Sequence, residues 1–192
     1  MASRNYYYFV ATLPSINYGD IPPKSSVEFL EECNYMLNPK DAALLPYCRY
    51  DPKLAVETLE PTGSDFIDLL MLRERVLALN LAFFRAAGLK RNAPEDPPQD
   101  MPRTVAVARA ASEMDDPLRA ALFIDQARWG ALDTMTALDD MFGVDNIFLH
   151  LLRLQLLERH QRLLPGMGRE MYRECRNAIL NEYNSRVKED ML

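Results

Sequence analysis

The thirteen prolines of this chain are bunched, and their distribution limits the fold more than any other feature. Seven of them lie in the first third of the chain, and four more lie in one short polar stretch near its middle. After Pro117 only Pro165 follows. Because proline breaks the interior of a helix, long helices can form only between these groups. The spacing predicts a segmented first third followed by long uninterrupted helices.

Two capping signals predict short helices in the first third. Ser25 stands three residues before Glu28, which is the spacing of a capping box, and apolar residues follow at helical intervals. Asn38-Pro39 is typical of an N-cap followed by proline at the first helical position. We therefore expect one helix after Ser25 and a second, shorter one after Asn38.

The longest predicted helix begins at Ser64, a residue type that caps helix N-termini, and runs to about residue 87. Gly88 follows and is expected to adopt the left-handed conformation that ends many helices. The polar, proline-rich stretch over about 89–103 then predicts an exposed, mobile linker. A short alanine-rich helix is expected over about 104–114.

Two further long helices are predicted in the second half of the chain. Asp116 and Pro117 are expected to open a helix that ends at Gly143. Asp145 is the predicted N-cap of the next helix, which closes before Pro165.

These signals together predict an all-α fold. No strand-like alternation follows residue 14, while the aromatic stretch 5–13 fits either a short buried strand or the first turn of a helix. A chain of 192 residues has the length of one domain. We predict a bundle of about six helices with a Tyr- and Pro-rich N-terminal segment, in a single domain over 1–192.

Composition and charge narrow the classes of function. The chain has 22 Lys and Arg against 28 Asp and Glu, a net charge of −6, so it is a poor match for nucleic acid, which usually needs a basic face. No apolar run reaches the about 18 residues that span a bilayer, and the first residues lack the apolar core of a signal peptide. The three cysteines lie far apart, which favours a reducing cytoplasm over a disulfide framework or a thiolate zinc site.

Polar residues interrupt the apolar stripes of two predicted helices. At about 100° per residue, Arg73 and Asn80 fall inside the apolar stripe of the first long helix. Asp125 and Arg128 fall among the apolar residues of the second. Because an unpaired buried charge is costly, we predict a buried polar cluster in which Arg73 and Asn80 meet Asp125 or Asp139. A network that fixes helix register is favoured here over a catalytic site.

The acidic stretch that contains Asp139, Asp140 and Asp145 suggests a metal site, but it lacks the spacing of a calcium loop. His150 and His160 are ten residues apart, which is about 15 Å along a helix and too far for one shared ion. Glycine-rich nucleotide loops and the Gly-x-Ser-x-Gly nucleophile motif are absent as well. We therefore predict no metal, no cofactor and no catalytic residue.

Two groups of residues are candidates for an interface. The run Tyr6-Tyr7-Tyr8-Phe9 fits an aromatic contact patch and a core insertion equally well. A last helix is predicted over about 169–183, and simple amphipathic packing is the favoured interpretation for it. Its basic and aromatic residues make it a second candidate contact surface: Arg169, Tyr172, Arg173 and Arg176.

Two blocks of sequence are more specific than a general helical pattern. The first is YYYFVATLP at 6–14, followed by PPKS at 22–25 and by Phe29-Leu30. The second is FGVDNI at 142–147, followed by LLRLQ at 151–155 and LER at 157–159. Over most of its length the chain resembles a bacterial family whose members are typically encoded among V-type ATPase subunits. The second block is also similar to a segment of the C subunit of V/A-type rotary ATPases (the d subunit in eukaryotes), although this chain is much shorter than a usual C subunit with its three helical lobes.

The resemblance implies a non-catalytic helical part of the ATPase. The C subunit sits on the membrane rotor ring and receives the central shaft, so the implied partners are the central-shaft and rotor-ring subunits, at the cytoplasmic face of the membrane. The family offers no catalytic residues to carry over. Two other hypotheses stay open: a free-standing helical adaptor or regulator, also as a homodimer, and a metal-dependent enzyme that uses Asp139, Asp140, Asp145 and His150.

Overall fold

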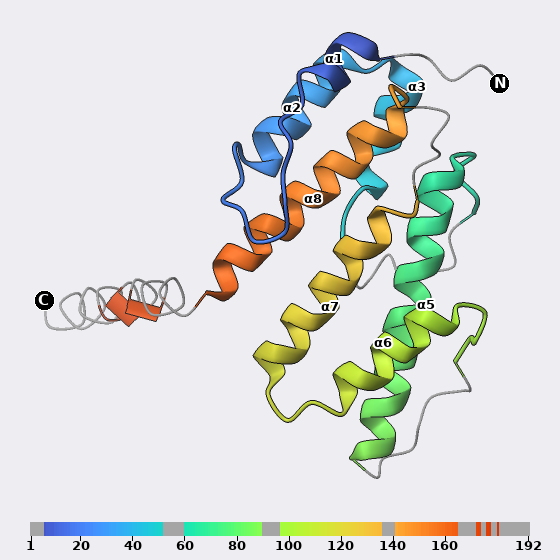
Figure 1. The fold of residues 1–192 in the computed structure, drawn as a ribbon, viewed down its shortest axis with the longest axis vertical. Coiled ribbons are helices and arrows are strands. Elements are labelled where there is room, and N and C mark those ends of the chain that lie inside the picture. Colours follow the sequence, from blue (N-terminus) through green and yellow to red (C-terminus); the bar gives the residue numbers. More distant parts are fainter. Residues whose placement is uncertain are drawn as a thin grey trace, which may run out of the picture.

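The computed structural model describes residues 6–51, 60–89, 97–135 and 141–164, together with residues 172, 173, 176, 177 and 180. Within these ranges every regular element is a helix and no strand is present, which confirms the predicted all-α class (Figure 1). The helices, in chain order, are α1 (Tyr7–Ala11), α2 (Ser26–Met36), α3 (Pro39–Ala42), the 3-10 helix η1 (Leu45–Tyr47), α5 (Asp65–Gly88), α6 (Pro102–Ser112), α7 (Pro117–Leu132) and α8 (Val144–Leu163).

The predicted start signals are confirmed at four helices. Ser25 and Glu28 form a reciprocal capping box at α2, with both hydrogen bonds at 3.1 Å. Asn38 accepts bonds from the first turn of α3, and Pro39 occupies its first position. Ser64 and Asp116 likewise cap α5 and α7 through their side chains.

The predicted ends of the long helices are less accurate. Gly88 is the last residue of α5 and not a left-handed cap, because the chain continues into Leu89 at φ −86°. α7 ends at Leu132 and not at Gly143. The reason lies in the last turn, where Thr134 bonds to the carbonyl of Ala131 through both its amide and its hydroxyl, which tightens the turn and ends the helix.

The start of α8 is also shifted from the prediction. Gly143 is its N-cap in an extended conformation, with φ −74° and ψ 168°. Asp145 therefore lies inside the first turn, where its negative charge suits the positive end of the helix dipole.

The proline-rich linker differs from the expected exposed stretch over 89–103. Pro97 is buried, and the carbonyl of Pro98 accepts a hydrogen bond of 2.9 Å from the Asn80 side chain on α5. Helix α6 already begins at Pro102. The N-terminal half of the linker, 90–96, lies outside the described residues.

The aromatic stretch whose conformation the sequence left open is helical, since α1 covers Tyr7–Ala11.

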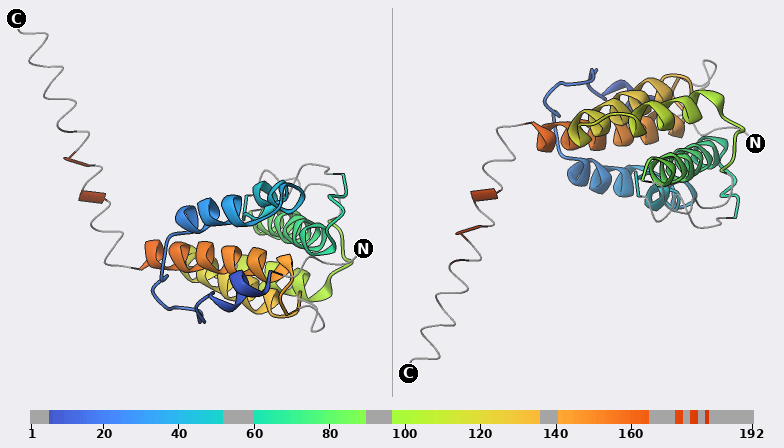
Figure 2. Two further views of the ribbon diagram at one scale, coloured as in Figure 1. Left: turned by 90° about the horizontal axis from the view of Figure 1, so that it is seen from above. Right: turned by 90° about the horizontal axis from the view of Figure 1, so that it is seen from below.

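Helix α8 is the centre of the bundle. It packs against α2 on one side and α7 on the other, and nine of its residues are buried. Figure 2 shows two layers, with α2 and α5 in one and α7 and α8 in the other. Phe66 of α5 reaches Phe148 of α8 across the layers, with ring centroids 6.3 Å apart. The central position of α8 explains why its buried residues, which lie between Ile147 and Leu157, include neighbours on successive faces of the helix.

A second, smaller apolar cluster joins α5, α6 and α7. It contains Leu77, Ala108, Ala111, Ala120 and Ile124. The alanines let α6 approach α5 closely, and these two helices share the most extensive contact in the bundle. Among the described helices, none is long and apolar enough to cross a membrane.

Candidate protein interface

The N-terminal segment of the described residues meets the turn that precedes α8. The amide of Tyr6 donates a hydrogen bond of 2.8 Å to the carbonyl of Phe142. Tyr7 packs on Phe142 with ring centroids 4.6 Å apart. The segment around α1 and the turn before α8 therefore form one local structure, although they lie far apart in the sequence.

Exposed side chains gather at this junction, which we call the aromatic end and define as Tyr7, Tyr8, Met141 and Phe142. Tyr8 is 85% exposed, Met141 67% and Tyr7 51%. The rings of Tyr7 and Tyr8 contact each other edge to face at 5.5 Å. Tyrosine and methionine are enriched where proteins bind proteins, so this end has the composition of a contact surface.

The neighbours of Tyr7 and Tyr8 anchor the aromatic end to the bundle. Phe9 is buried and stacks on Phe29 of α2 at 5.8 Å. The Tyr6 hydroxyl donates to Asp41 at 2.6 Å and accepts from the Asn38 side chain at 2.5 Å. Burial and the Asp41 carboxylate raise the pKa of Tyr6, so it stays a neutral donor.

The run Tyr6–Phe9 thus serves both of the roles that the sequence left open. Phe9 is in the core, Tyr6 is an anchor, and Tyr7 and Tyr8 face outward. In the last predicted helix, Tyr172, Arg173 and Arg176 are helical and exposed, while Arg169 lies outside the described residues.

A network of charged side chains occupies the interior between α5, α7 and α8. Arg128 of α7 holds both carboxylate oxygens of Glu74 on α5, at 3.0 Å through Nε and 2.6 Å through Nη2. It also reaches Asp125 at 3.1 Å, and the second oxygen of Asp125 accepts a bond of 2.7 Å from Arg159 on α8. Two positive and two negative charges therefore neutralise one another.

The ion pairs are important for stability because their side chains are largely buried. The Asp125 side chain is fully buried, and that of Arg128 is 16% exposed. Burial by itself lowers the pKa of Arg128, but Glu74 and Asp125 outweigh burial and raise this pKa overall. The Arg128 guanidinium also lies 4.9 Å from the centre of the Tyr50 ring. Burial, and next the negative charge of Glu74, raises the pKa of the Tyr50 hydroxyl. We call the four charged residues Glu74, Asp125, Arg128 and Arg159 the charged network.

The network contains two residues of the predicted polar cluster, Asp125 and Arg128, but the predicted pairing of Asn80 with Asp125 was wrong, while its pairing with Asp139 lies outside the described residues. The Asn80 amide instead donates to the carbonyls of Val76 and Pro98, both at 2.9 Å, because it lies nearer the C-terminal end of α5 and faces the segment before α6.

Arg73 is half-buried and lines a small cavity of about 10 Å³ with Glu74 and Arg128, so it borders the charged network, and burial lowers its pKa. No hydrogen bond or ion pair joins it to Asp125 within the described residues. Asp139 lies outside those residues.

Sequence reasoning missed Glu74 and Arg159. Glu74 had a usable signal, because it stands four residues after Leu70 and three before Leu77, on the edge of the same apolar stripe. Arg159 had none, because its side chain is 45% exposed and only its Nε reaches the buried carboxylate.

Among the residues considered for chemistry, His150, Cys33 and Cys48 are buried in the core. His150 is buried, and the centre of its ring lies 5.0 Å from the centre of the Phe29 ring. Burial, and to a smaller extent the positive charges of Arg153 and Lys24, lowers the pKa of His150 to about 4. Burial raises the pKa of Cys33 to about 12 and also raises that of Cys48, so both stay thiols. The described residues contain no group of three or more metal-ligating side chains, while Asp139 and Asp140 lie outside them.

The chain was compared with protein families, with curated proteins and with solved structures, and none of them matches it.

Proposed function

We propose that this protein is a non-catalytic structural or accessory subunit of a V/A-type rotary ATPase, similar to the C subunit, that links the central shaft to the membrane rotor. One observation supports the proposal above all. The two sequence blocks that carry the resemblance to the bacterial family encoded among V-type ATPase subunits, 6–14 and 142–147, are joined at the aromatic end by the Tyr6–Phe142 hydrogen bond and the Tyr7–Phe142 ring contact.

The interior of the bundle suits a part that transmits force. Helices α5 and α8 have 24 and 20 residues, and charged bonds tie both to α7. A torque-bearing adaptor needs such stiff connections and a large contact surface. The net charge of −6 favours docking to a basic partner face, and the partners would hold the protein at the cytoplasmic side of the membrane.

The aromatic end is the contact that we assign to this function. Tyr7 and Tyr8 are large, exposed and held on an anchored helix, so little conformational entropy is lost when a partner covers them. Truncation of such aromatic anchors typically costs about 2 kcal/mol or more of binding free energy, which is a loss of at least about thirtyfold in affinity.

The test is affinity purification of the tagged full-length protein from its native organism at low salt. We expect head, shaft or rotor subunits of the ATPase to co-purify, and the double variant Tyr7→Ala/Tyr8→Ala to lose them. Tyr35→Ala is the control, because Tyr35 is 89% exposed and belongs to α2, outside the four residues of the aromatic end.

Two outcomes contradict different parts of the proposal. If the unaltered protein recovers no ATPase subunit, the proposed function is wrong. If the Tyr7/Tyr8 double variant recovers these subunits as well as the Tyr35 variant does, the function stands and the aromatic end is not the contact.

A further inference from the structure

The segment 14–23, which we call the strap, joins α1 to α2 and lies across the bundle without forming a helix. In Figure 1 it runs from α1 toward the C-terminal end of α8 and then turns back into α2. Most of its residues are exposed, and the large apolar side chain of Ile21 is 80% exposed. Ile16 is the buried residue of the strap, and Tyr18 is half-buried.

The middle of the strap is a turn that is held by its own hydrogen bonds. The amide of Asp20 donates to the carbonyl of Asn17 at 3.1 Å, and the Asp20 carboxylate accepts from the Asn17 amide at 2.7 Å. Gly19 has a φ of 93°, which glycine adopts readily at the third position of a tight turn. Because these bonds are local, the turn does not need the helices to keep its shape.

Two side chains attach the strap to the helices. Ile16 belongs to the apolar core around α8. The centre of the Tyr18 ring lies 5.6 Å from that of Trp129 on α7 and 5.2 Å from that of His160 on α8. The Tyr18 hydroxyl donates to the carbonyl of Leu122 at 3.3 Å, which is long for a bond between two oxygens. Tyr18 thus contacts both α7 and α8.

The backbone of the strap adds nothing to this attachment. Among the described residues, no backbone N–H or C=O group of the strap forms a hydrogen bond with a helix. Pro14, Pro22 and Pro23 have no N–H to donate. Segments with few buried side chains and a backbone open to water separate from a fold at a lower free energy than its core helices do. The strap has both features.

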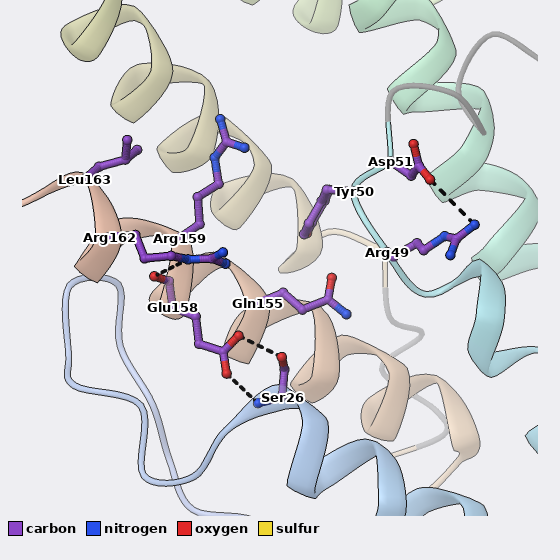
Figure 3. Close-up of a pocket in the computed structure, with 9 residues that line it drawn as sticks. All are labelled: Ser26, Arg49, Tyr50, Asp51, Gln155, Glu158, Arg159, Arg162 and Leu163. Atoms are coloured by element: carbon purple, nitrogen blue, oxygen red, sulfur yellow. Dashed lines mark hydrogen bonds and ion pairs between the residues drawn. The ribbon is translucent and has the colours of Figure 1, made fainter. Parts of the chain in front are cut away.

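The chain on either side of the strap is fixed to the bundle. On the side of α1, Phe9 is buried and stacks on Phe29 of α2. On the side of α2, Ser26 binds both carboxylate oxygens of Glu158, at 2.5 Å through its amide and 2.7 Å through its hydroxyl. Figure 3 shows this pair in the wall of a groove of about 450 Å³ at the C-terminal end of α8. A movement of the strap can therefore be confined to the residues between these two anchors.

The strap covers part of the seam between α7 and α8. Trp129, the single tryptophan of the chain, is half-buried there between the Tyr18 ring and the guanidinium of Arg153, which lies 5.1 Å from the centre of the indole ring. Burial, and next the negative charge of Asp125, raises the pKa of Tyr18, so its hydroxyl stays neutral beside the charged network. When the strap separates from the helices, Trp129 becomes more exposed.

We propose that the strap opens locally while the helices remain folded, and that the side chains of Ile16 and Tyr18 hold it closed. The strap is then a conformational device that controls access to Trp129 and to the seam between α7 and α8. The inference rests on the contacts of the strap alone and not on the proposed ATPase function.

The test is urea denaturation of the full-length protein, followed by two signals. Acrylamide quenching of the Trp129 fluorescence reports on the strap, and far-UV circular dichroism reports on the helices. We expect quenching to increase at a lower urea concentration than the one at which the helical signal is lost. Coincident transitions would overturn the proposal, because the strap and the helices would then unfold as one unit.

A matched pair of variants tests the attachment. Ile16→Val and Ile21→Val each remove one methylene group, from a side chain that is 8% exposed and from one that is 80% exposed. Ile16→Val should shift the quenching transition to lower urea and leave the helical transition in place, since the contact of Ile16 is already lost when the strap opens. Ile21→Val should shift neither transition. Equal shifts of both transitions in Ile16→Val would overturn the proposal.

Discussion

The charged network and the aromatic end use side chains in opposite ways. In the interior, Arg128 and Asp125 are charged and almost fully covered, and every charge has a partner. At the aromatic end, Tyr8 and Met141 are large and mostly uncovered. The buried charges are explained by the fold itself, whereas the exposed aromatics are not. The difference teaches that the charged network has a structural explanation in its own pairing, while the aromatic end leaves apolar surface that a partner could cover.

Removing a charge from the interior should have the greatest effect on stability. Asp125→Ala leaves the buried Arg128 with Glu74 alone and releases Arg159 from α7. We expect a loss of about 3–5 kcal/mol in the free energy of unfolding, measured by urea denaturation. Asp133→Ala, which removes an exposed partner of Arg153 just after α7, should cost less than about 1 kcal/mol. Equal losses for the two variants would contradict a structural role for the charged network.

Acid should weaken the packing of α8 against α2 through His150. Its pKa is about 4 in the folded protein against 6.5 in the unfolded chain, because burial disfavours the imidazolium. Between these values only the unfolded chain binds the proton, so stability falls as the pH falls from 6.5 to about 4 and then no longer changes from this source. The full loss is about 3 kcal/mol.

The control for the acid effect is His150→Leu, which keeps the apolar contact with Phe29 and removes the titrating group. Urea denaturation at about pH 7 and about pH 4.5 should show a smaller acid loss for this variant than for the unaltered protein. The same acid loss in both proteins would mean that other groups cause it.

Asn80 tests the polar contact that lies outside the charged network. Asn80→Leu keeps the volume but removes the donors to Val76 and Pro98, whose carbonyls then lose a partner. We expect a loss of about 1–2 kcal/mol and faster proteolysis at residues 97–101, since this bond holds the segment before α6. Unchanged proteolysis with lowered stability would mean that Asn80 acts only within α5.

The fold was predictable where local chemistry decides it. The caps at Ser25, Asn38, Ser64 and Asp116 act within three residues of themselves, so four helix starts could be placed correctly before any tertiary contact was known. The end of α7 was not predicted, although both Thr134 bonds to the Ala131 carbonyl span only three residues, because a threonine hydroxyl also donates to such a carbonyl inside continuing helices and so gives no stop signal.

The site was predictable only in part, for a physical reason. The spacing of apolar residues predicts that Asp125 and Arg128 are buried. It does not predict which side chains they bind, because that depends on which helices pack side by side. Asn80 does not meet Asp125 because the stripe of α5 faces α6 near one end and α8 near the other. Likewise, no local pattern separates Tyr8 from Phe9, since the contact with Phe29 on α2 decides which ring is covered.

The smallest effects on stability are expected at the aromatic end and its anchor, where removing one oxygen separates the anchoring Tyr6 from the exposed Tyr8. Tyr6→Phe loses the bonds to Asp41 and Asn38 and should cost about 1 kcal/mol. Tyr8→Phe changes an 85% exposed side chain and should cost less than about 0.5 kcal/mol. Thermal unfolding of the two variants measures this difference. A loss for Tyr8→Phe as large as that for Tyr6→Phe would mean that the Tyr8 hydroxyl is part of the framework, and the contrast between a fully paired interior and an uncovered aromatic surface would then fail at this residue.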